Sequence, residues 1–449
     1  MRKLGVVLVA MALVVPLQAA LAAHDFGQTG VNNNLVNNVV QLTYPDAGNT
    51  PPGLFASHDA AQCWGAYPWS SDGSQIVFTT QIPGECSDRS CNEIAIMNAD
   101  GSGFDRLTEN SDCDTHASFV PPGTAVVVYQ SEPDGWARIF SVNVATKVVT
   151  NLTEAHAHVA TCPGEDNDYT ENKPVVSPDG QHIAYRSCDT SLWVMDIDGT
   201  DPVEIAPPGL DIHHHSWDPT SSWLVFAVGC DLTGASRILM AAADGSSHDD
   251  LVELADHSAT DQCAGWPTWS PDGQWIAYHL GEGDSEEEDE GKAIWLVNPV
   301  TLARRLLVEG PAGQDVCGPT SWSPNSSFLA YKMDPDGNDS LRALYLVEVA
   351  NGAVWPLTNG FWDYRHWFAP SGAAILFRDA AGSGGYCQAS RDGCENGSDL
   401  LVLNLRNAAS FLGDEGIGLP IPAATPAGLI ALALLIAVAG AVVVVRRST

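Results

Sequence analysis

The chain has 449 residues, of which 20 are basic and 55 are acidic, giving a formal net charge of −35. A surface of that sign repels nucleic-acid phosphates and anionic lipid headgroups, so the composition argues against a nucleic-acid-binding role. The 11 cysteines are many for a reducing cytosol, and they favour an oxidising compartment.

The first segment in chain order has the layout of an export signal. A charged start precedes an apolar run over residues 4–15, and the small residues around Ala20 and Ala22 offer a cleavage site. This pattern predicts a secretory signal peptide over residues 1–22 that is not part of the fold. We therefore expect the rest of the chain to lie outside the cytoplasm, in the periplasm or at the cell surface.

A five-residue pattern then recurs along the chain, in its fullest form as Trp-Ser-Pro-Asp-Gly at residues 269–273. Its Pro-Asp-Gly core is typical of tight turns, and a short apolar run stands on each side of it. The third residue of the pattern falls at positions 71, 121, 178, 219, 271, 324 and 370. A period near fifty residues with four strands in each repeat is typical of propeller blades.

The seven repeats predict an all-β, seven-bladed propeller over residues 36–406. The seventh repeat lacks its last strand after Leu405, whereas a strand-like run at residues 39–43 stands before the first repeat. We expect this N-terminal strand to complete the seventh blade, which closes the ring and removes an exposed sheet edge.

The repeat resembles that of the TolB-type, WD-repeat-like β-propellers. The resemblance rests on Trp-Ser-Pro-Asp-Gly, the apolar strand after it, Met-Asn-Ala-Asp-Gly at residues 97–101 and the Leu-Thr pair that follows. It covers residues 36–406 and implies the propeller fold, but a fold of this kind does not determine an activity.

The segment after the repeats predicts a membrane anchor. Three prolines stiffen a spacer over residues 407–426, and the apolar run of residues 427–445 is long enough to cross a bilayer. The basic tail, residues 446–449, predicts a cytoplasmic C-terminus. The layout also resembles bacterial C-terminal sorting signals, so a plain anchor and a processed sorting signal both stay open.

Strand direction sorts the loops when the strands of a blade are lettered A to D from the centre outward. A–B and C–D turns share one face of the ring, and B–C loops and D–A links share the other. All the cysteines fall on this second face, and we expect them to form structural disulfides. The expected pairs, which leave Cys317 over, are Cys86–Cys91, Cys387–Cys394, Cys162–Cys188, Cys63–Cys113 and Cys230–Cys263.

Nine histidines precede an A strand, and A strands line the central channel of a propeller. They are His58, His116, His156, His158, His213, His214, His215, His257 and His366. Imidazoles that converge near a carboxylate can hold zinc, manganese or iron, and the candidates for a divalent metal are His58, His116, His214, His257 and His366. The alternative is a structural role, since a histidine before the inner strand of a WD-repeat blade is often a hydrogen-bonding residue.

Three acidic stretches have an oxygen content that calcium can use. Residues 334–339 space their oxygens like a calcium loop, but Tyr345 stands where the bidentate glutamate would be. Residues 284–290 form a charge run that we expect to be solvated. Residues 196–201 are better explained as a hairpin turn.

The sequence leaves two functions open. One is a binding module, not an enzyme, whose B–C and D–A loop face takes a protein or a glycan; the residues expected on that face are His156, His158, His213, His215, Asp261 and Asp363. The other is a metal-dependent polysaccharide lyase or hydrolase, because oligogalacturonate lyases look similar: they are propellers of this repeat type that hold a metal with histidines. No Gly-x-Ser-x-Gly and no P-loop points to another enzyme class.

Overall fold

The computed structural model describes residues 36–42, 55–56, 67–81, 92–133, 137–154, 173–187, 190–229, 236–248, 250–258, 262–282, 290–311, 316–333, 343–358, 363–379 and 399–405. The predicted signal peptide, spacer, apolar run and basic tail lie outside these residues. Within the described ranges no helix has the length and apolar character needed to span a bilayer.

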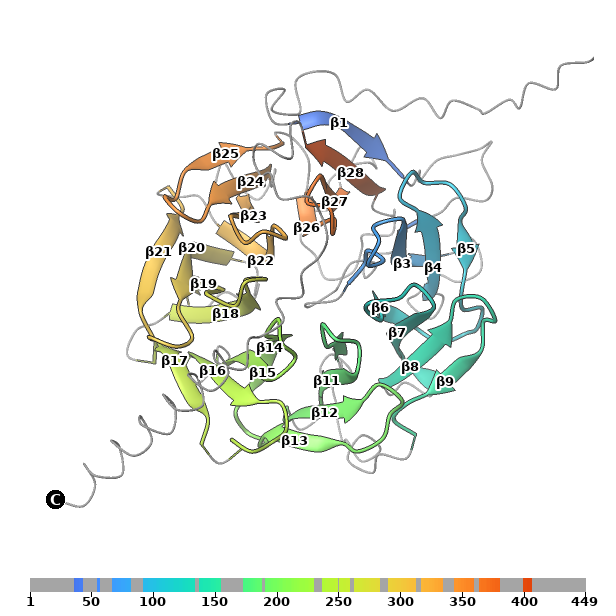
Figure 1. Cartoon of the computed structure of the whole chain (residues 1–449), viewed down its shortest axis with the longest axis horizontal. Helices are drawn as coiled ribbons and strands as arrows, with labels where there is room; N and C mark the ends of the chain where they lie inside the picture. The colour runs from blue at the N-terminus through green and yellow to red at the C-terminus, as the bar shows by residue number, and fades with distance from the viewer. Residues whose placement is uncertain are drawn as a thin grey trace, which may run out of the picture.

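The described strands form seven four-stranded antiparallel blades arranged around a centre (Figure 1). The first three blades consist of β2 (Phe55–Ala56), β3 (Gln75–Gln81), β4 (Asn92–Asn98) and β5 (Asp105–Arg106); β6 (Thr115–Phe119), β7 (Val126–Ser131), β8 (Arg138–Asn143) and β9 (Val149–Asn151); and β10 (Val175–Val176), β11 (His182–Arg186), β12 (Leu192–Asp196) and β13 (Val203–Ala206).

The fourth to sixth blades continue the ring. They consist of β14 (Ile212–Trp217), β15 (Trp223–Val228), β16 (Arg237–Ala242) and β17 (Val252–Asp256); β18 (Gln262–Trp269), β19 (Ile276–Glu282), β20 (Glu290–Val297) and β21 (Arg304–Glu309); and β22 (Val316–Trp322), β23 (Phe328–Met333), β24 (Ala343–Glu348) and β25 (Val354–Pro356).

The seventh blade contains both ends of the described ring. Its strands are β26 (Asp363–Phe368), β27 (Ala374–Asp379), β28 (Asp399–Leu405) and, as the outermost one, β1 (Val36–Gln41). Strand β1 pairs antiparallel with β28, with Val36 opposite Leu405 and Gln41 opposite Leu401. The predicted seven-bladed propeller and its closure by an N-terminal strand are therefore confirmed.

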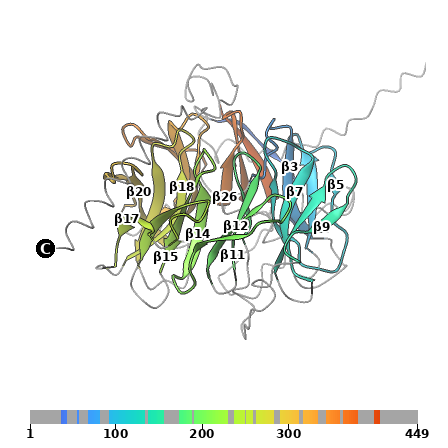
Figure 2. The same cartoon turned by 60° about the horizontal axis from the view of Figure 1, so that its bottom comes forward.

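The hydrophobic core lies between the blades. The sheets stand side by side around the ring (Figure 2), and a separate apolar cluster fills each of the seven junctions. The closing junction, for example, joins Trp69 and Ile76 of the first blade to Leu376 of the seventh and to Leu42, which follows β1. Each sheet is covered on both faces, which explains why the middle strands read as nearly continuous apolar runs.

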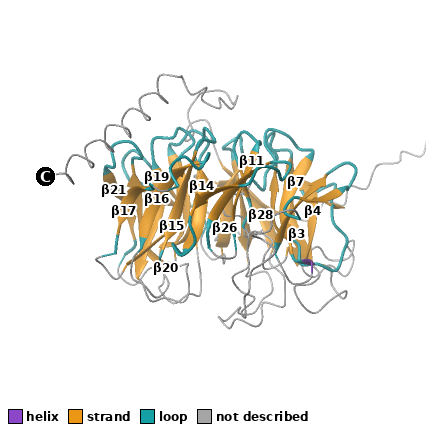
Figure 3. Cartoon of the chain, turned by 90° about the horizontal axis from the view of Figure 1, so that it is seen from below, coloured by secondary structure: helices purple, strands orange, loops and turns teal. Residues whose placement is uncertain are grey.

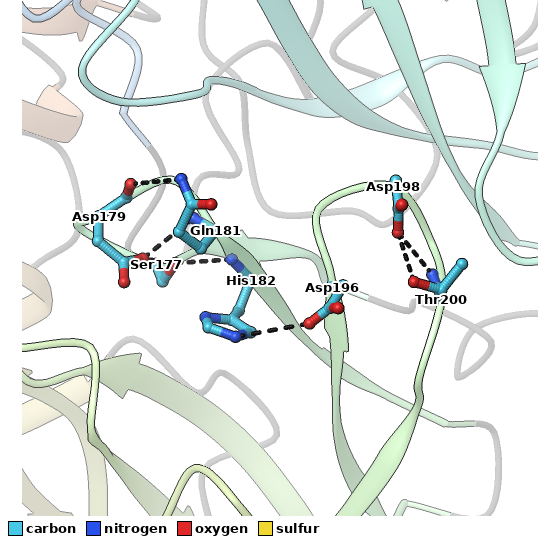
Figure 4. Close-up of polar contacts among 7 residues, drawn as sticks. All are labelled: Ser177, Asp179, Gln181, His182, Asp196, Asp198 and Thr200. Atoms are coloured by element: carbon cyan, nitrogen blue, oxygen red, sulfur yellow. Dashed lines mark hydrogen bonds and ion pairs between the residues drawn. The ribbon is translucent and has the colours of Figure 1, made fainter.

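The recurring turn connects the first two strands of each blade and uses the serine as its centre. In the third blade the Ser177 hydroxyl donates to Asp179 Oδ1 at 2.6 Å and accepts the His182 N–H at 2.9 Å (Figure 4). The same two bonds recur around Ser70 and Ser270. Figure 3 shows the described short turns gathered along one face of the ring.

One acidic stretch of the sequence belongs to these turns. Asp198 accepts the Thr200 N–H at 3.0 Å and its hydroxyl at 2.7 Å, which closes the turn between β12 and β13 (Figure 4). Residues 196–201 are thus a hairpin turn, as predicted. The other two acidic stretches lie outside the described residues, except that Glu290 begins β20.

Neighbouring blades are also held by hydrogen bonds and close backbone approaches. Trp217 Nε1 of the fourth blade donates to Val175 O of the third at 2.9 Å, and Trp69 Nε1 of the first donates to Trp367 O of the seventh at 3.4 Å. One pairing was not predicted: β20 reaches β22 through Glu290 and Gly291, so the fifth and sixth blades share one sheet.

Candidate functional site

The inner strands begin irregularly, on the side of the ring opposite the tight turns. Their pairing slips by a bulge in β6, β14, β18, β22 and β26. A bulge adds a residue to one strand and redirects the side chains beside it. The starts of these strands therefore carry side chains that regular strands would not present.

One repeat position concentrates polar and aromatic side chains at these starts. It lies three residues before the first residue of each turn motif and holds His116, Lys173, His214 and Trp266 in four consecutive blades. We call these four residues the collar. All are buried, and three of them, His116, Lys173 and Trp266, have left-handed φ values of 56°, 41° and 55°.

The three consecutive histidines of β14 point to different neighbours. His213 Nε2 lies 3.1 Å from Asp211 Oδ2. His214 stacks on Trp266 with ring centroids 4.2 Å apart, and its Nδ1 accepts the Trp266 N–H at 3.3 Å. His215 interacts with the backbone of Ala184 and Lys173 in the preceding blade. The His213 and His214 rings lie 6.1 Å apart, and the bulge between Ile212 and His214 interrupts the regular alternation of side chains here. The three imidazoles therefore have separate polar partners.

A buried cationic cluster surrounds His215. Lys173 is 8% exposed, Arg186 5% and His215 3%. The Arg186 Nη1 donates to Ile212 O at 2.8 Å, which holds its guanidinium against the start of β14. Burial lowers the pKa of His215 to about 3, with further lowering by the charges of Arg186 and Lys173. His215 is therefore a neutral imidazole, and this region combines two cations with an uncharged acceptor.

The other metal candidates do not join this group. The Nδ1 of His116 lies 2.9 Å from Thr115 Oγ1, and His366 is buried in β26 opposite Phe377. His257 follows the outer strand β17, and its Nε2 lies 3.4 Å from the Tyr278 hydroxyl. Among the residues that the structure describes, no three histidine, cysteine, aspartate or glutamate side chains come together in a way that could hold a metal ion.

Some predicted site residues cannot be placed. His58, His156, His158 and Asp261 lie outside the described residues, and of Asp363 only the backbone is described, opposite Asp379 at the start of β26. The predicted face is therefore represented by His213 and His215. The metal hypothesis and the role of the unplaced histidines stay predictions.

The bonding state of two cysteines, Cys113 and Cys263, is known in the described part of the chain. Cys113 is a thiol, and its Sγ accepts a hydrogen bond from the Asn92 amide at 3.6 Å, so its predicted pairing with Cys63 is wrong. Cys263 is disulfide-bonded to a cysteine outside the described side chains. The remaining pairs stay predictions.

Sequence reasoning missed Lys173 and Arg186. A signal for Lys173 was present, since it is one of only five lysines and occupies the repeat position of His116 and His214. Arg186 ends β11, and nothing in the sequence indicates that it reaches the carbonyl of Ile212 in the next blade.

No family model matches the chain. The known proteins that it resembles are similar in fold and much less similar in sequence. The Escherichia coli K12 protein YidR, described as uncharacterized, is 30% identical over 110 residues, which is 23% of this chain and 24% of YidR. The match therefore spans about a quarter of that relative.

Solved structures match over more of the chain. Oligogalacturonate lyase from Vibrio parahaemolyticus is 14% identical, with a TM-score of 0.57 over 83% of this chain and 94% of its own. An oligogalacturonate lyase in complex with manganese is 17% identical, with the same TM-score and coverage. TolB from Acinetobacter baumannii is 15% identical over 64% of each chain, with a TM-score of 0.42. At sequence identities of 14% and 17%, the similarity to the two lyase structures shows that this chain has the same propeller fold, and it shows the fold alone.

Proposed function

We propose that the chain is an extracytoplasmic propeller that acts as a protein- or glycan-binding module, and that its ligand bears carboxylate groups received near the collar. One observation carries the choice of an anionic ligand. Lys173 and Arg186 are both less than 9% exposed beside neutral His215, although acidic residues outnumber basic ones by 55 to 20. An ammonium and a guanidinium group buried side by side favour an anionic ligand over a neutral or cationic one.

The chemistry of the cluster suits such a ligand. A guanidinium and an ammonium group donate charge-assisted hydrogen bonds to a carboxylate, and a neutral imidazole can accept a hydrogen bond from a hydroxyl group. A glycan that contains sugar acids offers both groups. The proposed location outside the cytoplasm rests on the predicted signal peptide and on the number of cysteines.

The binding test compares an acidic with a neutral oligosaccharide of equal length by calorimetry on the purified protein. We expect binding of the acidic one, weakened at least about tenfold by Lys173→Met, because one charge-assisted contact contributes about 1.5–3 kcal/mol. Lys147→Met is the matched control, since Lys147 pairs with Asp105 at 2.6 Å on the outside of the ring. Equal affinity of both variants, with circular dichroism unchanged, contradicts the proposal.

A second candidate is the metal-dependent polysaccharide lyase. The observation in its favour is the propeller likeness to a lyase solved with manganese. The described histidines do not by themselves supply a site for that ion, so the candidate depends on residues that are not described. Metal content after chelator washing, together with ultraviolet absorbance of the unsaturated product of β-elimination, decides between the two. A protein that binds without metal or turnover supports the binding module.

A further inference from the structure

Two buried carboxylates meet at the junction of the first and second blades, apart from the cationic cluster around His215. Glu93 belongs to β4 and is 3% exposed, and Asp114 directly precedes β6 and is fully buried. Their backbones are tied together through Asn92, whose carbonyl accepts the Asp114 N–H at 2.9 Å. The pair is therefore fixed by the fold rather than carried by mobile surface side chains.

Neutral groups satisfy three of the four carboxylate oxygens. Glu93 accepts the Thr108 hydroxyl at 2.6 Å and the Asn110 N–H at 2.7 Å. The side-chain amide of Asn110 donates to Asp114 Oδ2 at 3.0 Å. Asp114 Oδ1 is buried and has no hydrogen-bond partner in the part of the chain that the structure describes. A buried carboxylate oxygen without a partner costs free energy unless a proton or a cation reaches it.

No cationic side chain lowers the pKa of Asp114. The pKa of Asp114 is raised to about 7, first by burial and also by the charge of Glu93. The pKa of Glu93 is raised by burial as well, and Arg106 lowers it only in part. Arg106 itself pairs with the exposed Glu109 at 3.2 Å. The site thus holds two acidic groups with less positive charge than they need.

We propose that Glu93 and Asp114 hold a hard, oxygen-seeking cation of the Ca²⁺ class, with Asp114 Oδ1 as one of its ligands. Carboxylates accompanied by neutral hydroxyl and amide oxygens suit calcium, whereas zinc and copper favour nitrogen and sulfur. The hydroxyls of Ser131 and Thr108 interact with the Asp114 side chain and lower its pKa in part, and they supply such neutral oxygens. The neighbouring Cys113 bonds instead with Asn92.

The test uses the purified protein at pH 8, stripped with a chelator and then titrated with Ca²⁺. We expect saturable binding by calorimetry and a rise of at least about 3 °C in the melting temperature at a hundredfold excess over Kd. Asp114→Asn is expected to remove both effects while it stays folded, because the amide needs no counter-charge. Glu109→Gln, which removes the same charge from an exposed side chain of the same loop, keeps both.

Two results overturn the proposal. One is the absence of Ca²⁺ binding and of any melting shift, which leaves a proton as the partner of Asp114 Oδ1. The other is a shift of equal size in the wild-type protein and in Asp114→Asn, which places the ion elsewhere. Neither result affects the proposed function, because that function depends on Lys173 and Arg186 of the third blade and not on Glu93 or Asp114.

Discussion

Asp114 makes the stability of the whole ring depend on pH. Its pKa is about 7 in the folded protein and 3.8 without the fold, because burial disfavours the charged form. The folded state therefore holds a proton that the unfolded state has lost between these two values. The contribution of this proton is fully present below pH 3.8 and disappears as the pH rises towards 7, and it amounts to about 4 kcal/mol at ~1.4 kcal/mol for each pKa unit.

The expected outcome is a difference between the wild type and Asp114→Asn that grows with pH. In chelator-treated buffer the two are equally stable near pH 4, and at pH 8 the variant is more stable by about 2–4 kcal/mol. Denaturant unfolding at each pH measures this difference. Acids such as Asp72, whose pKa is lowered to about 2, change the stability with pH in the opposite direction. Both proteins contain them, so their effect cancels when the two stabilities are subtracted. A constant difference across this range is the contradictory result.

A second prediction at the residue scale concerns Gly180, in the tight turn of the third blade. Its φ is +69°, and a Cβ placed on it would stand 1.7 Å from the carbonyl oxygen of Pro121 in the second blade. Gly180→Ala is expected to destabilise the protein by about 2–4 kcal/mol, from backbone strain and the displaced contact together. Gly209→Ala is the matched control, because its φ is +84° and nothing lies within 4 Å. If thermal unfolding shows that both variants lose the same stability, the contact with Pro121 has no effect and the prediction is wrong.

At the scale of elements, several blades contact the preceding blade in the same way. In these blades the glycine in the turn between the two outer strands approaches the outermost strand region of the preceding blade, as Gly199 does at Leu152 and Gly245 at Val203. In the first blade Gly101 approaches Leu42, which follows β1. The N-terminal strand therefore supplies the contact that the missing fourth strand of the seventh repeat would have made.

Much of this element order was accessible from the sequence, because the turn chemistry recurs with the period of a blade. The spacing of the turn motifs, which begin at residues such as Trp69 and Trp217, predicted the number of blades. The absence of a last strand in the seventh repeat predicted that an N-terminal strand closes the ring. The pairing of Glu290 with Cys317 was not accessible, since it depends on how far two strands of different blades extend.

The candidate site was less predictable. Nothing in the local pattern placed Arg186 beside His215, because their proximity results from the packing of two blades. The separate partners of His213, His214 and His215 depend on the bulge at the start of β14, which the sequence does not indicate. Counting histidines before the inner strands led to an expected convergence that the described residues do not show.

At the scale of the whole molecule, closure is predicted to be a stability element. Deletion of residues 1–42 removes β1 and Leu42, which exposes the edge of β28 and opens the core of the closing junction. We expect a loss of at least about 3 kcal/mol and aggregation through the bare edge. Deletion of residues 1–34 only is the control, since it keeps β1. Thermal unfolding and size-exclusion chromatography distinguish the two proteins, and equal behaviour would show that closure is dispensable.

The net charge predicts an unusual salt response for the proposed anionic ligand. The body of the protein, with a net charge of −35, repels such a ligand over long distances, and salt screens this repulsion. The attraction by Lys173 and Arg186 acts at short range in a buried place, where screening is weak. Affinity measured from about 50 to 500 mM NaCl is therefore expected to stay constant or to rise. A steep fall would indicate binding to exposed cations instead.

The register of the closing pair also determines how the ring responds to tension. Val36 begins β1 directly opposite Leu405, the last residue of β28, so the two chain directions leave the seventh blade at the same end of one ladder. A force that pulls these two ends apart acts on the first rung alone and opens the ladder like a zipper, rung after rung, instead of loading all rungs together. The propeller would yield to pulling at this pair at much lower force than a ring whose closing strands were pulled in shear.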